Sequence, residues 1–287
     1  MNANAFPLLS IFEPKLRLEV PLFQRQYVWN REQQWEPLWE DISRKFTEHL
    51  DGRLDAPVHF LGAMVLDQKF APITHVARRQ VIDGQQRLTT LQLFLAAFRD
   101  FCSEHECDDL AEETRKYTLN TGMMVNPEVD RFKVWPTALD RAQFSDVLTS
   151  GSREEVERRH PIVRRKYARH DDPRPRMVEA YLYFYDGISA FFLDDEHHSM
   201  EEPEASLATR LEACFTALIS SLQVVVIDLD DKDDPQVIFE TLNARGEPLL
   251  PADLLRNYIF LRAGRLGQNQ EELYARYWTG FDDDFWR

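Results

Sequence analysis

The segment best suited to chemistry runs from Asp83 to Arg87 and reads D-G-Q-Q-R. A strand-like apolar run leads into it and a helix-like run follows. The N-terminus of a helix presents unpaired N–H groups and a positive dipole, so we expect it to bind a phosphate. Gly84 permits close backbone approach, Arg87 offers a planar fork to phosphate oxygens, and Asp83 can hold Mg²⁺ or a water. An ordinary turn, with Asp83 as N-cap and Arg87 paired to a surface acid, stays open.

A second candidate segment mixes aromatic, amide and arginine side chains between Pro21 and Trp29 without a clean period. Such a composition is typical of a loop that lines a pocket. Arg25 is a further candidate phosphate donor, and Tyr27 and Trp29 offer stacking or apolar walls. Aromatic packing beneath the following helix is the alternative, and we favour it for Phe23 and Trp29.

A third candidate is the polar loop within Phe239 to Leu249, which holds Asn243, Arg245 and Gly246 together. Such a loop between two helices can bring a donor onto a ligand bound elsewhere. Gly246 could instead merely supply the left-handed conformation that ends a helix.

The charge of the chain argues against non-specific binding to polyanions. The 34 basic and 49 acidic residues give a formal net charge of −15, which opposes attraction to DNA, RNA or an anionic membrane. Contact with DNA must therefore use a local basic patch. The alternative is that the basic residues of such a patch only form a solvated helix face. The best candidates for DNA binding are Arg164, Arg165, Lys166 and Arg169.

Several common classes of site are absent from the sequence. No apolar run approaches the ~20 residues of a membrane span, and the N-terminus lacks a secretory signal, so we expect a cytoplasmic protein without membrane contact. The 3 cysteines match no common zinc spacing, which predicts reduced thiols and no cysteine-bound metal. We find no Walker A loop, no G-x-S-x-G elbow and no histidine pair at i and i+4.

The elements that position these segments follow an α/β pattern. Strands are predicted over Leu16–Pro21, Phe60–Leu66, Val76–Ile82 and Leu222–Leu229, with a short one at Phe132–Trp135. Helices are predicted over Arg31–Leu50, Gln85–Phe101, Asp108–Leu119, Ala138–Leu148, Glu154–His170 (broken at Pro161), Arg176–Leu193, Ala205–Ser220, Pro235–Thr241, Pro251–Arg262 and Glu271–Arg287. We divide the chain into a small α/β (α+β) core with a mixed sheet, 1–102, and a mostly helical region, 103–287, that returns a strand and the Asn243–Gly246 loop to the core.

Four motifs in this order resemble the N-terminal domain family of the GmrSD-type restriction endonucleases, which includes SspE-like phage-defence effectors. The motifs are FQRQYVW, FLGAMVL, VIDGQQRLTTLQLF and VIFETLNARGEPLLPADLLRNYIF, and they span Val20 to Phe260. The resemblance implies a ParB/sulfiredoxin-like core whose D-G-Q-Q-R motif binds and hydrolyses a nucleoside triphosphate, GTP foremost, with Mg²⁺. It implies catalytic roles for Asp83, Gln86 and Arg87, with Asp83 also holding the metal. Nucleotide-binding roles fall to Gly84, Gln85, Gln24, Arg25, Asn243 and Arg245.

The resemblance also implies partners. SspE-like members are thought to sense phosphorothioate DNA, whereas GmrSD members act on glucosylated hydroxymethylcytosine. We favour phosphorothioate, because its sulfur suits the apolar FQRQYVW segment, and assign its sensing to Tyr27, Gln26 and Trp29. The expected partners are modified double-stranded DNA and a C-terminal HNH-type nuclease domain that would follow residue 287, and a homo-oligomer is left open.

Two other classes of function stay open. The chain could nick DNA itself, with Asp83 and an acid such as Glu240 holding a metal, which a nicking assay on the isolated chain would reveal. It could instead be a non-catalytic module that uses the helix N-terminus only to hold a DNA phosphate.

Overall fold

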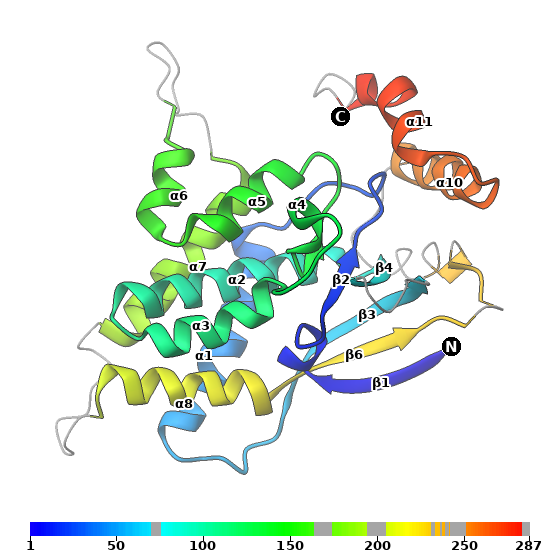
Figure 1. Cartoon of the computed structure of the whole chain (residues 1–287). Coiled ribbons are helices and arrows are strands. Elements are labelled where there is room, and N and C mark those ends of the chain that lie inside the picture. The colour runs from blue at the N-terminus through cyan, green and yellow to red at the C-terminus, as the bar shows by residue number, and fades with distance from the viewer. Residues whose placement is uncertain are drawn as a thin grey trace.

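A six-stranded mixed sheet forms the centre of the computed structural model, in the order β1-β6-β3-β4-β2-β5 (Figure 1). The structure describes residues 1–69, 76–163, 174–193, 205–230, 233–235, 237, 238, 241 and 251–282. The strands are β1 Asn2–Pro7, β2 Leu16–Glu19, β3 His59–Lys69, β4 Ala77–Asp83, β5 Val134–Trp135 and β6 Leu222–Asp228. β6 runs antiparallel to β1 and parallel to β3, β4 runs antiparallel to β3, and β2 runs parallel to both β4 and β5.

The helices are distributed along the sequence between the strands and after the last strand. They are α1 Glu36–Leu50, α2 Gln85–Glu104, α3 Asp108–Thr118, α4 Pro127–Asp130, α5 Arg141–Ser150, α6 Arg153–Arg159, α7 Arg176–Leu193, α8 Leu207–Ser220, α10 Pro251–Arg265 and α11 Gln270–Tyr277. Shorter turns are the 3₁₀ segments η1 Leu9–Ile11 and η4 Thr279–Phe281, and the π segment η2 Arg31–Trp35. In the part of the chain that the structure describes, no helix is long and apolar enough to cross a membrane.

The two faces of the sheet pack against different partners. On β3, Met64 and Leu66 belong to the main core with α2, whereas Val65 joins Ile82 on the opposite face, as the two-residue period of a strand requires. α2 is buried around most of its circumference, so it is the central helix of a block formed by α1, α3, α7 and α8. The pair α10 and α11 lies apart from this block, beside the end of β2 (Figure 1).

The structure confirms the predicted α/β class, with a mixed sheet and many helices. The predicted strand at Leu222–Leu229 is β6, which enters the sheet between β1 and β3. β1 is an additional strand that the sequence analysis missed. The division at residue 102 remains a prediction, and the main core includes residues from both sides of it.

Candidate functional site

Strand β4 passes directly into helix α2 through Gly84. This residue adopts a left-handed conformation with φ of 95°, which side chains other than glycine rarely adopt. A Cβ atom placed there would lie 2.8 Å from Cβ of Met64 on the neighbouring strand. Both the turn and the close packing therefore require glycine, and the first N–H groups of α2 remain at the end of the strand.

Arg87, in the first turn of α2, is held against β3. Its Nη1 donates a hydrogen bond of 2.6 Å to the carbonyl oxygen of Ala63. The guanidinium packs on Gly62, where an added Cβ would lie 2.8 Å from Cζ of Arg87. Gly62 has a φ of 105°, so a bulge of β3 forms a cradle for this arginine. The sequence predicted the arginine and missed the cradle.

Burial dominates the electrostatics of the turn. It raises the pKa of Asp83, although the N–H of Gly84 and the charges of Arg87 and Arg25 act in the opposite direction. Burial likewise lowers the pKa of Arg87, and Asp83 opposes that shift. These interactions place Asp83 near two cationic side chains in a partly desolvated site.

The N-cap alternative for Asp83 is not what the structure shows. The N-cap of α2 is Gly84, and no side chain caps this helix. Arg87 donates to a backbone carbonyl, and the described residues contain no ion pair to it within 4.0 Å. Neither Asp83 nor Arg87 therefore has the purely structural role that the sequence left open for it.

Three glutamine side chains join the turn to the segment 24–29. Gln24 donates from Nε2 to the carbonyl oxygens of Val81 and Ile82, at 3.1 and 3.3 Å. Gln85 donates to the carbonyl of Arg25 at 3.1 Å. The two motifs that sequence analysis treated separately therefore form one unit, with Arg25 held next to the start of α2.

The side-chain amide of Gln86 clamps the loop by binding its backbone through both the oxygen and the nitrogen. Its Oε1 accepts the N–H of Val28 at 2.8 Å and that of Trp29 at 3.4 Å, and its Nε2 donates to the carbonyl of Gln26 at 3.0 Å. Both ends of the buried amide bind the loop backbone, so Gln86 has a positioning role in the structure, and the catalytic role assigned to it stays a prediction.

Tyr27 is a core residue. Its ring is 5% exposed, and its hydroxyl accepts from Nε1 of Trp35 at 2.8 Å and contacts Oγ1 of Thr90 at 2.7 Å. Since Thr90 can donate in turn to the carbonyl of Gln86 at 2.8 Å, the Tyr27 hydroxyl donates to Thr90. A ring buried this deeply supports core packing, which is the alternative for this residue, and the sensing role of Tyr27 stays a prediction.

The other predicted sensing residues, Gln26 and Trp29, are partly buried. Trp29 packs against the main core, as the alternative reading of that residue predicted. The loop that carries them is also held at Val28, whose carbonyl accepts from Arg176, and at the N–H of Tyr27, which donates to Asp140 at 2.9 Å. Neither Asp140 nor Arg176 was found from the sequence, because both lie far away along the chain.

Several predicted site residues lie outside the described residues. These are Asn243, Arg245 and Glu240, together with the DNA-binding candidates Arg164, Arg165, Lys166 and Arg169. Their assignments stay predictions.

A magnesium ion fits the turn only as a companion of phosphates. Among the described residues no group of three or more His, Cys, Asp or Glu side chains could hold a metal. Mg²⁺ on a nucleotide needs only one or two carboxylates, because waters and phosphate oxygens complete its shell. Asp83 supplies one such carboxylate beside the helix N-terminus.

Comparison with known proteins assigns the chain to a family. No curated protein matches the chain. Residues 8–260 match the family described as "GmrSD restriction endonuclease, N-terminal domain". This match covers most of the chain, including the loop 24–29, β3, the Asp83–Arg87 turn and the first part of α10. The chain therefore belongs to the N-terminal domain family of GmrSD restriction endonucleases, as a defence domain associated with such an enzyme.

Proposed function

We propose that this chain hydrolyses nucleoside triphosphates, GTP foremost, at the Asp83–Arg87 turn, and that a restriction system uses this hydrolysis to respond to modified DNA. The observation that carries the proposal is the convergence of Arg87, Arg25 and Asp83 on the open N-terminus of α2. A half-buried carboxylate and two arginines at a helix N-terminus, with no ion pair to Arg87 among the described residues, favour a phosphate site over a structural ion pair.

Each group at the turn has a distinct task in this proposal. The N–H groups of α2 and the guanidinium of Arg87 would bind the β- and γ-phosphates and stabilise the charge that develops in the transition state. Arg25 adds a second cation from the clamped loop. Asp83 would hold Mg²⁺ or orient the attacking water, and a bound Mg²⁺ neutralises phosphate charge.

The DNA response is the less defined part of the proposal. With Tyr27 in the core, Gln26 and Trp29 remain as candidates for contact with the modified group, and we favour phosphorothioate as that group. Gln86 binds the backbone of both residues and lies one residue from Arg87. The effect of a DNA contact on this loop would therefore be transmitted to the phosphate site through the side chain of Gln86.

Phosphate release from GTP, ATP and UTP, with Mg²⁺ and with paired duplexes that differ only in the modification, tests this function. We expect turnover that Asp83→Asn abolishes and that the control Asp109→Asn, an exposed aspartate on α3, retains. DNA binding without any nucleotide turnover would show a non-catalytic module. Nicking of DNA by the chain would support the nuclease alternative.

A further inference from the structure

A cavity lies on the far side of β4 from α2. It has a volume of about 520 Å³, and its walls include Pro21, Gln80, Pro235, Leu261 and Gln270. A narrow recess of about 10 Å³ opens beside it, and Pro21, Pro235 and Leu261 line both spaces. The two spaces share these three lining residues between β4 and α10, and the charged side chains of Glu19, Asp67, Arg78 and Arg79 also line the larger one.

Two buried amides line the recess with unused acceptors. Gln24 and Asn257 are 6% and 4% exposed, and among the described residues neither Oε1 of Gln24 nor Oδ1 of Asn257 has a hydrogen-bond partner. The orientation of Gln24 is fixed, because its Nε2 already donates to two carbonyls of β4. Burying an unpaired acceptor is costly unless a donor reaches it.

The recess adjoins the phosphate site along the chain. Ile82, in its wall, directly precedes Asp83, and Gln24 directly precedes Arg25. Gln80, in the wall of the larger cavity, lies about 10 Å from Asp83 at the usual rise of a strand. A nucleotide with its phosphates at the start of α2 can therefore extend its base toward this cavity.

We propose that the cavity holds the base of the nucleoside triphosphate, and that Gln24 and Asn257 read N–H donors on its edge. This inference rests on the proposed function. The recess offers acceptors between the apolar side chains of Ile82, Leu261 and Pro21, a combination that suits a flat heterocycle with N–H groups. A base that lacks those donors leaves both oxygens unpaired, so the site rejects it.

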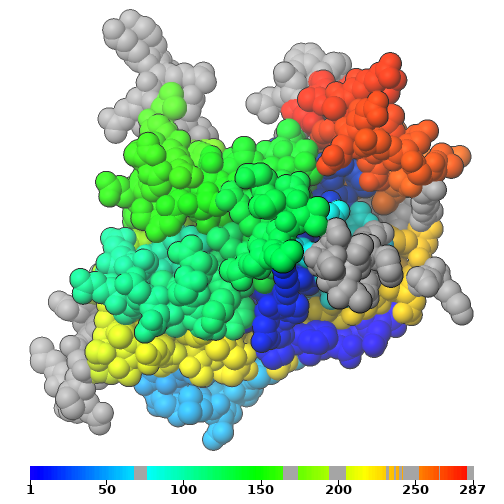
Figure 2. All heavy atoms as spheres, viewed as in Figure 1, coloured from blue at the N-terminus to red at the C-terminus, as the bar shows by residue number. Residues whose placement is uncertain are grey.

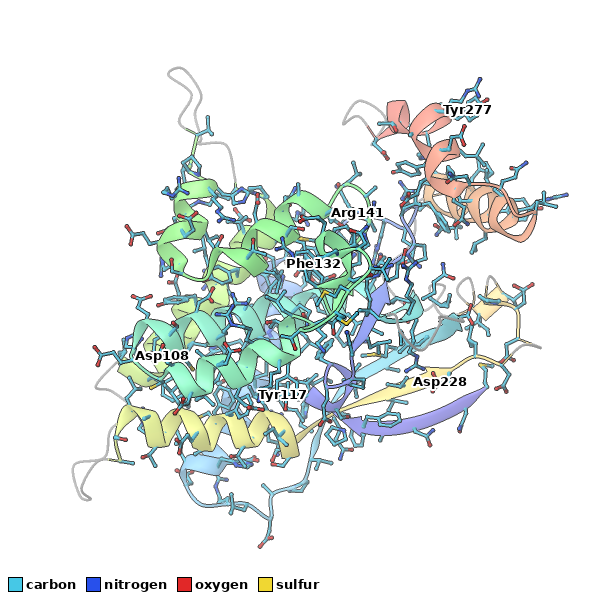
Figure 3. All side chains as sticks on the ribbon, in the orientation of Figure 1. Asp108, Tyr117, Phe132, Arg141, Asp228 and Tyr277 are labelled. Atoms are coloured by element: carbon cyan, nitrogen blue, oxygen red, sulfur yellow. The ribbon has the colours of Figure 1, made fainter. Side chains whose placement is uncertain are left out.

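Entry of the base edge requires Leu261 on α10 to move, since this side chain lines both spaces. α10 rests on the loop through the stack of Phe260 on Phe23, with ring centroids 5.4 Å apart. Its neighbour α11 is joined to α5 by an ion pair between Glu271 and Arg141 at 3.8 Å, and Figure 3 labels Arg141. Figure 2 shows α10 and α11, in orange and red, beside a small part of the blue N-terminal segment, most of which is uncovered on this face.

The first test compares three purine nucleoside triphosphates. Their bases are guanine, which carries two kinds of N–H donor, hypoxanthine, which carries one, and unsubstituted purine, which carries none. We expect binding, measured by calorimetry, and turnover to fall by about tenfold at each step. Equal affinity across the series would overturn the base site and leave the proposed hydrolysis standing. Failure to bind or hydrolyse any triphosphate would overturn both.

The second test uses isosteric variants of Asn257. Asn257→Leu removes the acceptor, and we expect the preference among the three bases to disappear without a fall in Tm, because Oδ1 of Asn257 has no hydrogen-bond partner among the described residues. Asn257→Asp keeps an acceptor and should keep the preference, as should the control Arg262→Leu, an exposed position on the same helix. A preference that survives in folded Asn257→Leu would overturn the proposal, as would loss of affinity for modified DNA instead of nucleotide.

Discussion

Asp83 is a carboxyl group whose burial outweighs two nearby arginines. Its raised pKa means that the folded protein keeps the proton at pH values where the unfolded chain has released it. The free energy of unfolding should therefore fall as the pH rises from the ordinary aspartate pKa of about 3.9 to the raised pKa, and stay level above it.

Asp83→Asn should remove this dependence. Urea unfolding of wild type and variant across this range measures it, and the informative quantity is the difference between the two proteins, because Asp100 also has a pKa raised by burial. We expect the variant to gain relative stability as the pH rises. Parallel curves would show that the carboxyl group is not desolvated in the fold.

Gly62 controls the position of Arg87 without touching a ligand. Gly62→Ala places a methyl group 2.8 Å from the guanidinium carbon, so the arginine must shift, and a displacement of about 1 Å can cost about 10²-fold in rate. The control is Gly151→Ala, which has a similar left-handed conformation with φ of 77° and no atom within 4 Å of the added Cβ.

Both variants should lose about 1–2 kcal/mol of stability to backbone strain, as urea denaturation measures. Only Gly62→Ala should lose nucleotide turnover. Equal turnover in the two folded variants would remove Gly62 from the positioning of Arg87.

Side chains of helix α2 hold the loop 24–29 in place by hydrogen bonds to its backbone. The loop itself forms neither a strand nor a helix. Gln86→Leu should cost about 1–3 kcal/mol, because it removes hydrogen bonds to Gln26, Val28 and Trp29. Gln92→Leu is the matched control, since this buried amide of α2 donates to Tyr117 at 3.0 Å and does not touch the loop.

Amide hydrogen exchange distinguishes the effect of Gln86→Leu from that of Gln92→Leu. The Val28 amide should exchange faster in Gln86→Leu than in Gln92→Leu at matched global stability, because its acceptor is removed only in the former. Equal protection of Val28 in both variants would show that the loop is held by its other contacts.

The elements differ in how far the sequence could predict them. The passage from β4 into α2 was predictable, because an apolar strand, a glycine and a long apolar helix follow one another directly. β1 was missed because Asn2–Pro7 is exposed throughout and rich in poor strand formers, so that only pairing with β6 makes it a strand. The burial of Tyr27 was undecidable, since the composition of its loop suits a pocket and a core equally.

The clamp by Gln86 and the open acceptor of Asn257 could not be predicted either. Their partners lie about 60 residues away or in another layer of the fold, and side-chain amides carry no periodic signal. Gly62 had a weaker signal, because glycine inside a strand pattern indicates a bulge or a close backbone approach.

The whole chain is strongly acidic, with a formal net charge of −15, so DNA binding must depend on a few basic residues. Charge reversal of Arg164 and Arg165 to glutamate should weaken binding and reduce the slope of log K against log salt by about 2. The matched control reverses Arg115 and Lys116, which pair with glutamates on α3. An unchanged slope would remove the first pair from the interface.

The most direct measurement is nucleotide turnover by Arg87→Ala with Mg²⁺, under saturating GTP and under the best alternative triphosphate. Arg115→Ala, at a half-buried arginine on α3 that pairs with Glu112 away from the turn, serves as the control. We expect turnover in Arg87→Ala to fall by about 10²–10³, because one donor to the developing phosphate charge is lost while the core is untouched. Turnover equal to that of the wild type in a folded Arg87→Ala protein would contradict the assignment of the Asp83–Arg87 turn as the site of hydrolysis.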